Sequence, residues 1–134
     1  MDALKILEAV LSAAAPITAI VAQRVYPLEL PPAKPVVLPA IVTSQVSDDG
    51  LPTLDAAATY QMRTAVVETH LITKSIAELD TLRLAVCAAC DFQRGTHAGF
   101  AVSSMSPGRI GMPENDSTIG VCYLPITFTL IYRR

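Results

Sequence analysis

Apolar residues recur at helical spacing at the start of the chain. Within residues 1–16 they fall on one face, and polar side chains occupy the opposite face. This spacing predicts an amphipathic helix, and Pro16 ends its regular part. The apolar face comprises Leu4, Leu7, Leu11 and Ala14.

A second helical pattern begins at Ser75. Ser75 and Glu78 have the S-x-x-E spacing of a capping box, in which two side chains satisfy backbone amides at a helix start. The helix is expected to stop near Gly95. Its predicted buried stripe is Ile76, Leu79, Leu82, Val86 and Cys90.

Four segments follow the pattern of strands. They are residues 40–47, 59–72, 96–105 and 117–134. The last alternates most clearly, and Pro125 inside it indicates a sheet edge or a bulge. The second is irregular at Val66 and Val67, which indicates either two covered faces or a bulge. The apolar face of the last strand comprises Cys122, Leu124, Ile126, Phe128, Leu130 and Tyr132.

Two connections carry the turn-forming residues. Residues 48–52 read as a turn that ends the first strand, and residues 106–117 read as a polar loop. The element order is therefore α-β-β-α-β-β. It predicts a single α+β domain over residues 1–134, with a mostly antiparallel four-stranded sheet and two helices packed on one face.

Prolines stiffen the segment between the first helix and the first strand. Residues 24–42 hold five of the ten prolines, so residues 27–39 are expected to form an extended arm. Rigid loops lose little entropy on docking, which suits permanent subunit contacts. The alternative is that this arm and the 106–117 loop are ordinary connectors.

Composition shifts attention from chemistry to surfaces. The chain has 134 residues, of which 51% are apolar and 16% charged, so some apolar surface is expected to meet a partner. The net charge is −2 with no basic cluster, which argues against a nucleic-acid binder. The uncharged run at 9–23 is too short for a membrane span and contains Pro16.

The C-A-A-C sequence at Cys87 and Cys90 is the most suggestive chemical motif. A redox dithiol has its first cysteine at a helix N-terminus, whereas this pair lies at the far end of a predicted helix. A zinc site could recruit His97 and Cys122 as well, but a second compact ligand pair is missing. Packing in the core is therefore the favoured interpretation, and the thiols are expected to remain reduced.

No catalytic constellation is evident in the sequence. His70 and His97 are the only histidines, and His97 is interpreted as a strand-end residue. Asp48 and Asp49 precede a glycine as turn formers, with Asp55 nearby. Paired carboxylates can do acid/base work, but in such a turn they are usually solvated. The sequence favours a protein that is not an enzyme and needs no cofactor or metal.

Nearly the whole chain resembles the tail completion, or tail terminator, family of long-tailed bacteriophages. The matching segments are VAQRVYPLELPP, LPAIVTSQVS, LPTLD, MRTAVVETHLITKSIAELDTLRLAV, ENDST and ITFTLIYRR. The resemblance implies a structural virion protein in the tail-neck region, made in the host bacterial cytoplasm. Copies of the chain, expected to be six, would form a ring that caps the tail tube, ends its polymerisation and joins it to the head connector.

The resemblance also implies partners and surfaces. The partners would be further copies of the chain, the tail tube protein and the head-closure or connector protein, and DNA would pass through the lumen without specific binding. Asp48, Asp49 and Asp55 are candidates to face that lumen. Candidate subunit or tube contacts are Pro27, Leu30, Pro31, Pro32, Pro35, Arg109, Ile110, Met112 and Pro113.

Two alternatives remain open. One is another neck ring protein, a head-closure or adaptor component. The other is a small thiol or zinc-binding protein that uses the C-A-A-C segment.

Overall fold

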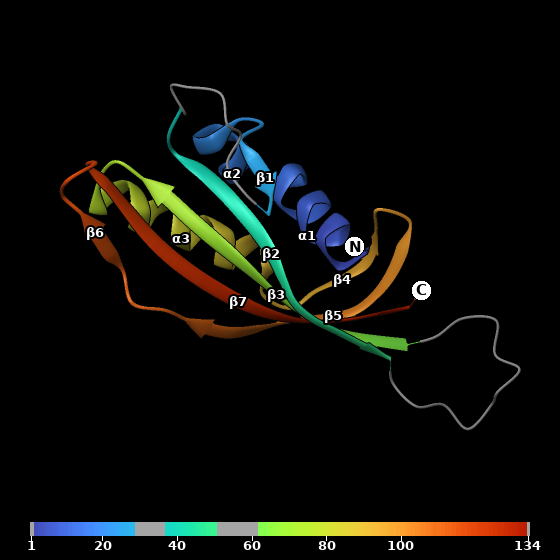
Figure 1. The fold of residues 1–134 in the computed structure, drawn as a ribbon. Helices are drawn as coiled ribbons and strands as arrows, with labels where there is room; N and C mark the ends of the chain where they lie inside the picture. The colour runs from blue at the N-terminus through green and yellow to red at the C-terminus, as the bar shows by residue number, and fades with distance from the viewer. Residues whose placement is uncertain (1, 29–36, 51–61, 134) are drawn as a thin grey trace, which may run out of the picture.

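The computed structural model describes residues 2–28, 37–50 and 62–133. The chain begins with two helices and continues through strands that are interrupted by one long helix (Figure 1). In chain order the elements are α1 (Asp2–Ala13), α2 (Ala15–Val21), β1 (Val25–Pro27), β2 (Ala40–Gly50), β3 (Met62–Thr73), α3 (Ile76–Cys90), β4 (Gln93–His97), β5 (Phe100–Ile110), β6 (Glu114–Asp116) and β7 (Val121–Arg133).

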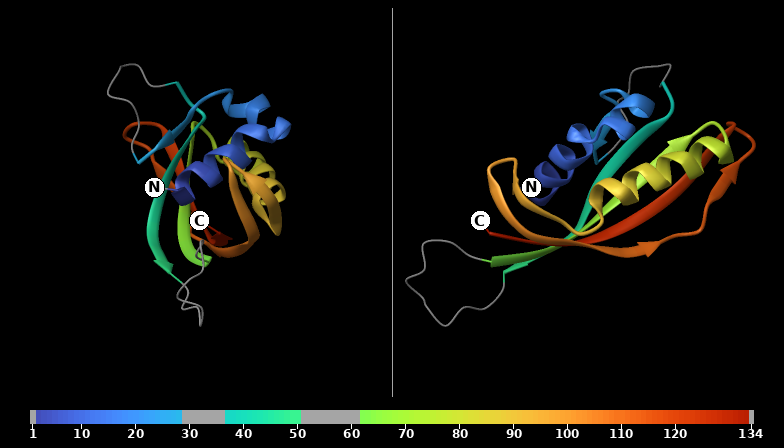
Figure 2. Two further views of the ribbon diagram at one scale, coloured as in Figure 1. Left: turned by 90° about the vertical axis from the view of Figure 1, so that its right-hand side faces the viewer. Right: turned by 180° about the vertical axis from the view of Figure 1, so that it is seen from behind.

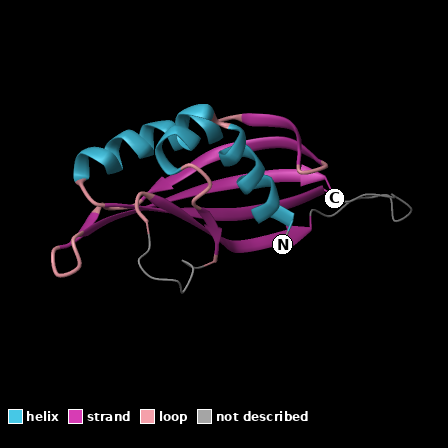
Figure 3. Ribbon diagram, turned by 90° about the horizontal axis from the view of Figure 1, so that it is seen from above, coloured by secondary structure: helices cyan, strands magenta, loops and turns pink. Residues whose placement is uncertain are grey.

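The strands form one mixed, seven-stranded sheet. Its order is β1-β2-β3-β7-β5-β4, and β6 pairs with β7 beyond the end of β5. Among the strands of the described residues, β1 and β2 run parallel and the other pairs are antiparallel. The sheet curls around α1 and α3, as the turned views in Figure 2 and the view from above in Figure 3 show.

The predicted four-stranded, mostly antiparallel sheet with two helices is therefore wrong: the described residues form seven strands and three helices. Pro16 does not merely end the first helix. It lies at the start of α2, where its missing amide proton costs nothing. The predicted turn at 48–52 is also wrong for Asp48, Asp49 and Gly50, which belong to β2. The predicted loop at 106–117 contains the end of β5 and all of β6.

The hydrophobic core lies between the helices and the sheet. The predicted stripe of α1 is confirmed, with Leu4, Leu7 and Leu11 buried and Ala14 packed against them. The predicted face of β7 is also confirmed, since burial alternates along the strand. At the start of α3, Ser75 accepts a hydrogen bond from the Glu78 amide at 3.2 Å, as the capping box predicts.

A bulge in β2 reverses the direction of its side chains. Gln45 pairs with Val67, but Ser47 pairs with the adjacent Val66, so Val46 is an extra residue. Side chains alternate between faces along a strand, so this insertion changes which positions point inward. As a result Asp48, opposite the buried Ala65, faces the helices. The irregularity expected near Val66 and Val67 is a bulge, although the extra residue belongs to the neighbouring strand.

Pro125 lies where β7 changes partners on one side. β5 pairs with β7 up to Ile126, and β6 pairs with it from Tyr123. Between them the Gly111 amide donates to the Pro125 carbonyl at 2.8 Å. Proline has no amide proton for a ladder hydrogen bond, and Pro125 lies at the break between the two pairings.

No single helix among the described residues is long and apolar enough to cross a membrane. By length and composition alone, α1 and α2 pass that test as a pair, with a bend of 89° between them.

Candidate functional site: an apolar interaction surface

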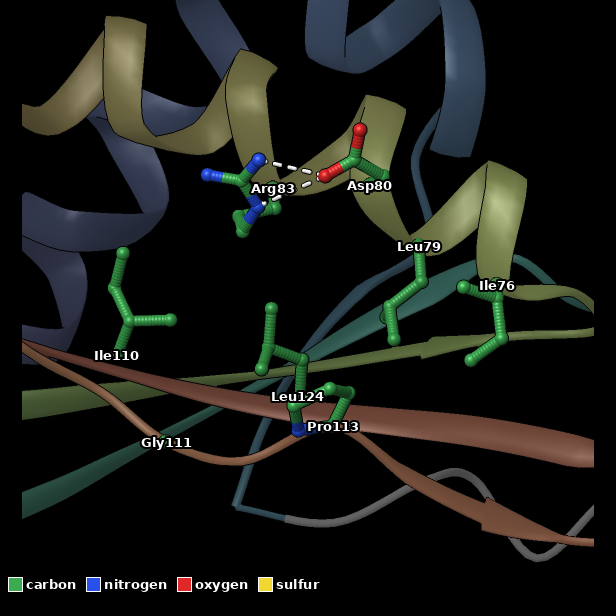
Figure 4. A pocket seen from close by; sticks show the side chains of 8 residues that line it. All are labelled: Ile76, Leu79, Asp80, Arg83, Ile110, Gly111, Pro113 and Leu124. Carbon is green, nitrogen blue, oxygen red and sulfur yellow. Dashed lines mark hydrogen bonds and ion pairs between the residues drawn. The ribbon is translucent and has the colours of Figure 1, made fainter.

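An apolar pocket of about 300 Å³ lies between α3 and the connection from β5 to β6. Figure 4 shows side chains from the helix on one side and from this connection and β7 on the other. Apolar groups dominate the lining, and one ion pair lies on the helix side. The lining residues are Ile76, Leu79, Asp80, Arg83, Ile110, Gly111, Pro113 and Leu124.

Local geometry explains why these residues meet. Positions 76, 79, 80 and 83 are three, four and seven residues apart, so they share one face of α3. The opposite wall depends on Gly111, because a Cβ there would lie 2.5 Å from Cγ of Pro125. Only a glycine lets the connection lie this close to β7.

The polar edge of the pocket is an ion pair on α3. Arg83 Nη2 donates to Asp80 Oδ1 at 2.6 Å, and Arg83 Nε donates to the same oxygen at 3.2 Å. The hydrogen bond that Arg83 donates to Asp80 is the largest cause that raises the pKa of Arg83. Exposed pairs of this kind add little to stability, but they supply both charges beside an apolar hollow.

The sequence-predicted contact residues are divided among several places. Ile110 and Pro113 line the pocket, and Met112 between them is 80% exposed. Arg109 is exposed on β5 beside a second hollow that includes Glu68. Pro27 is exposed at the end of β1. Leu30, Pro31, Pro32 and Pro35 lie outside the described residues.

Sequence reasoning missed the helix side of this pocket. Ile76 was predicted to be buried, but it is 52% exposed at the first position of α3. The helical repeat shows which face of the helix a residue occupies. It does not show whether the sheet covers that face at the first turn, where Ile76 lies. Leu79 and Leu124 were predicted as core residues, and both are buried at the base of the pocket.

A polar cluster joins the outer ends of β2, β3 and β7. Arg63 Nε donates to Asp48 Oδ1 at 2.7 Å, and Tyr132 donates its hydroxyl proton to Asp48 Oδ2 at 2.6 Å. Burial first, and then the hydrogen bond to Asp48, raise the pKa of Tyr132 to about 12. The Phe100 ring meets the Tyr132 ring edge to face, with centroids 5.9 Å apart.

This cluster bears on the three candidate lumen aspartates. The Asp48 carboxylate is engaged by Arg63 and Tyr132 and is only 17% exposed, so it is not the solvated turn residue that the sequence indicated. Asp49 is exposed on β2, and Asp55 lies outside the described residues. Whether any of them faces a lumen remains a prediction.

The cysteines and histidines form no evident reactive centre in the described part of the chain. Cys90 is buried, and burial is the main cause that raises its pKa to about 12. Burial also raises the pKa of Cys87. Such thiols are poor nucleophiles. His97 ends β4, as expected, and His70 Nε2 lies 3.7 Å from Glu68 Oε2.

The zinc alternative lacks a ligand set in the residues that the structure covers. No group of three or more histidine, cysteine or acidic side chains is placed there to hold a metal ion. Cys122 is buried on β7, with its sulfur 3.8 Å from Asn115 Oδ1. The C-A-A-C segment therefore closes the end of α3 against the core, with Cys90 buried and Cys87 packed against it.

Solved structures share this fold. A chain from the virion of a native gene transfer agent particle matches with a TM-score of 0.72 and 18% identity, over 98% of this chain and 97% of the other. A second solved structure matches with a TM-score of 0.55 and 14% identity, over 90% and 87% of the two chains. No protein-family model matches the sequence, and no curated protein matches it either. At these identities the likeness establishes the fold.

Proposed function

We propose that this protein is a structural virion component of the phage type, a tail terminator that forms a ring on the tail tube. The observation that carries the proposal is the near full-length likeness to a chain of a gene transfer agent virion. Fold alone does not imply function, but this likeness agrees with the short motifs along the chain that resemble the terminator family. The ring is expected to contain six copies, to stop tube growth and to join the tube to the head connector.

The exposed surface supports an assembly role. Ile76, Ile110 and Met112 expose large apolar side chains at or beside the pocket on α3. Aromatic, aliphatic and methionine side chains at a recessed patch with a charged edge are typical of protein interfaces. The polar cluster at Asp48 binds the ends of three strands together.

The charge distribution is compatible with DNA passing through a ring. A net charge of −2 and the absence of a basic run leave few cations to hold phosphate groups. Because Arg63 neutralises Asp48, Asp49 and Asp55 would supply most of the negative charge among the three candidate lumen residues.

The proposed function is tested by binding to purified tail tube protein in the absence of heads. The expected results are capped tube ends in electron micrographs and a ring whose mass is near six times 14.3 kDa by light scattering. If the protein does not bind tube ends and binds only the head connector, it would instead be a head-closure or adaptor ring. A protein that binds neither partner would contradict a neck role altogether.

A further inference from the structure

A prominent exposed aromatic side chain lies just after α3. Phe92 is 72% exposed and has a φ of 58°. Bulky residues seldom adopt positive φ, so this backbone is strained. A backbone hydrogen bond stabilises this conformation, because the Phe92 amide donates to the Met105 carbonyl at 2.8 Å. The ring is therefore presented to solvent from a backbone that is hydrogen-bonded to β5.

The preceding residue, Asp91, also lowers the stability of the isolated chain. Asp91 puts a carboxylate at the C-terminal end of α3, where the helix dipole disfavours negative charge. Its Oδ1 is buried without a hydrogen-bond partner, and in the described part of the chain Gln45 is the other residue with such an atom. Both features cost stability.

Local rules are broken in this way mainly at functional sites. Strain, an unfavourable charge and an exposed aromatic ring all occur within two adjacent residues here. Aromatic anchors are prominent among the side chains that dominate binding energy at protein interfaces.

The pocket on α3 is a suitable receptor for this ring. It lies along the first half of α3, whereas Phe92 lies two residues beyond the last residue of the helix. At a rise of 1.5 Å per residue, the middle of the pocket and Phe92 are roughly 20 Å apart. Phe92 therefore cannot fill the pocket of its own chain. A volume of about 300 Å³ with an apolar lining is sufficient for a phenyl group.

The charges beside the two features are complementary. Phe92 is flanked by Asp91 and by the exposed Arg94. The pocket edge carries Arg83 and Asp80. When Phe92 of one copy docks in the pocket of another, Asp91 can meet Arg83. Arg94 can likewise meet Asp80.

We propose that Phe92 of one copy occupies the α3 pocket of the next copy. The proposal rests on the ring of the proposed function and specifies one of its contacts. Because the two copies use different surfaces, the contact is heterologous and can close into a ring. Asp91 then meets a basic side chain, whereas no ion pair among the described residues involves it.

The direct test places p-benzoyl-phenylalanine at position 92 and mixes copies of natural and heavy isotope content. Illumination is carried out with and without tail tube protein, so that assembly on a tube end is also sampled. We expect mixed-isotope cross-links to residues 76–83 or 110–113 of another copy. Cross-links to another surface, or none between copies in either mixture, would overturn the proposal.

A mutational test uses Phe92→Ala and Ile110→Asp, with Ile119→Ala as the matched control because Ile119 is exposed to a similar extent, 62%. We expect each of the first two variants to weaken self-association at least tenfold, with little further loss in the double variant. The control should associate as the wild type does. Circular dichroism checks that each variant is folded.

These results separate the contact from the function. If Phe92→Ala forms rings and caps tubes normally, the contact is wrong and the terminator role stands. If the wild-type protein does not bind tube ends, but the position-92 photocross-linker variant cross-links between copies, the terminator role is wrong and the Phe92 contact is supported. Association that stops at two copies would overturn the ring arrangement of this contact.

Discussion

Replacing Tyr132 with phenylalanine tests the polar cluster that ties β2 to β7. The substitution removes one hydroxyl and leaves the ring that packs against Phe100. The lost hydrogen bond spans 2.6 Å to Asp48, which is ion-paired with Arg63. Bonds to charged groups contribute about 1.5–3 kcal/mol. Asp48 keeps Arg63, and its side chain is 17% exposed, so water replaces part of the loss and we expect about 1.5 kcal/mol at pH 7.

The pH dependence gives an independent test of the same contact. Burial and the hydrogen bond to Asp48 raise the pKa of Tyr132 to about 12, from roughly 10 in an unfolded chain. A raised pKa stabilises the fold fully below the unfolded value, and this stabilisation is lost as the pH rises towards the folded value. The difference in unfolding free energy between wild type and Tyr132→Phe should therefore stay constant below about pH 9 and shrink between about pH 10 and 12.

Urea denaturation followed by circular dichroism measures both effects. A loss of about 1.5 kcal/mol corresponds to a midpoint lower by roughly 0.5–1.5 M, given m-values of about 1–3 kcal/mol per molar urea. Tyr123→Phe is the matched control, because Tyr123 lies on the opposite face of β7. An unchanged midpoint for Tyr132→Phe, or a difference that does not vary up to pH 12, would refute this account of the cluster.

Three further predictions concern other parts of the fold. Gly108→Ala should lower the unfolding free energy by about 1–3 kcal/mol, because its Cβ would lie 2.5 Å from the Thr127 carbonyl oxygen, whereas at Gly50 the nearest contact is an ordinary 3.7 Å. Ser75→Ala removes the hydroxyl that caps α3 and should cost about 1 kcal/mol in urea unfolding. Iodoacetamide at pH 8 should leave Cys90 unmodified in the native protein, because burial raises its pKa to about 12, and should modify it in urea.

Specific outcomes would contradict these three predictions. Equal midpoints for the alanine variants at positions 50 and 108 would mean that β5 does not lie against β7 as described. Ser75→Thr keeps a capping hydroxyl, so a loss as large as that of the alanine variant would argue against capping. Peptide mapping that finds Cys90 alkylated as fast in native protein as in urea would show that the thiol is accessible.

The elements best predicted from the sequence are those whose hydrophobic repeat is long. β7 alternates over its whole length, and its buried face is as predicted. The α3 start is marked by a side-chain cap that the structure contains. In these segments local pattern and tertiary burial agree, so the pattern alone is sufficient.

The missed features depend on partners that are distant in sequence. Residues 93–97 and 100–110 form a hairpin closed by Ala98 and Gly99, both at positive φ. The dipeptide is not one of the usual two-residue turn sequences, so the sequence gives no signal for it. Gly108 and Gly111 resemble loop residues, yet each is needed because β7 approaches too closely for a side chain.

The α3 pocket could be predicted only in part. The sequence drew attention to Ile110 and Pro113 because prolines and glycines surround them. The sequence could not place them across the pocket from Ile76. That arrangement depends on the point along β7 at which pairing with β5 ends and pairing with β6 begins. Asp48 was misassigned for a similar reason, because one extra residue in β2 decides which way its side chain points.

The central position of β7 has a consequence for how the chain matures during synthesis. β7 pairs with β3 over residues 62–73 and also with β5 and β6, and it supplies Phe128, Leu130 and Tyr132 to the core. Until residues 121–133 leave the ribosome, β3 and β5 have no strand between them, and α3 lacks the part of the sheet that β7 provides. Because such long-range pairing forms late, a nascent chain lacks the wall of the α3 pocket that Leu124 provides. If the contact between copies proposed above is correct, a nascent chain that lacks residues 121–133 cannot yet offer a complete α3 pocket to another copy.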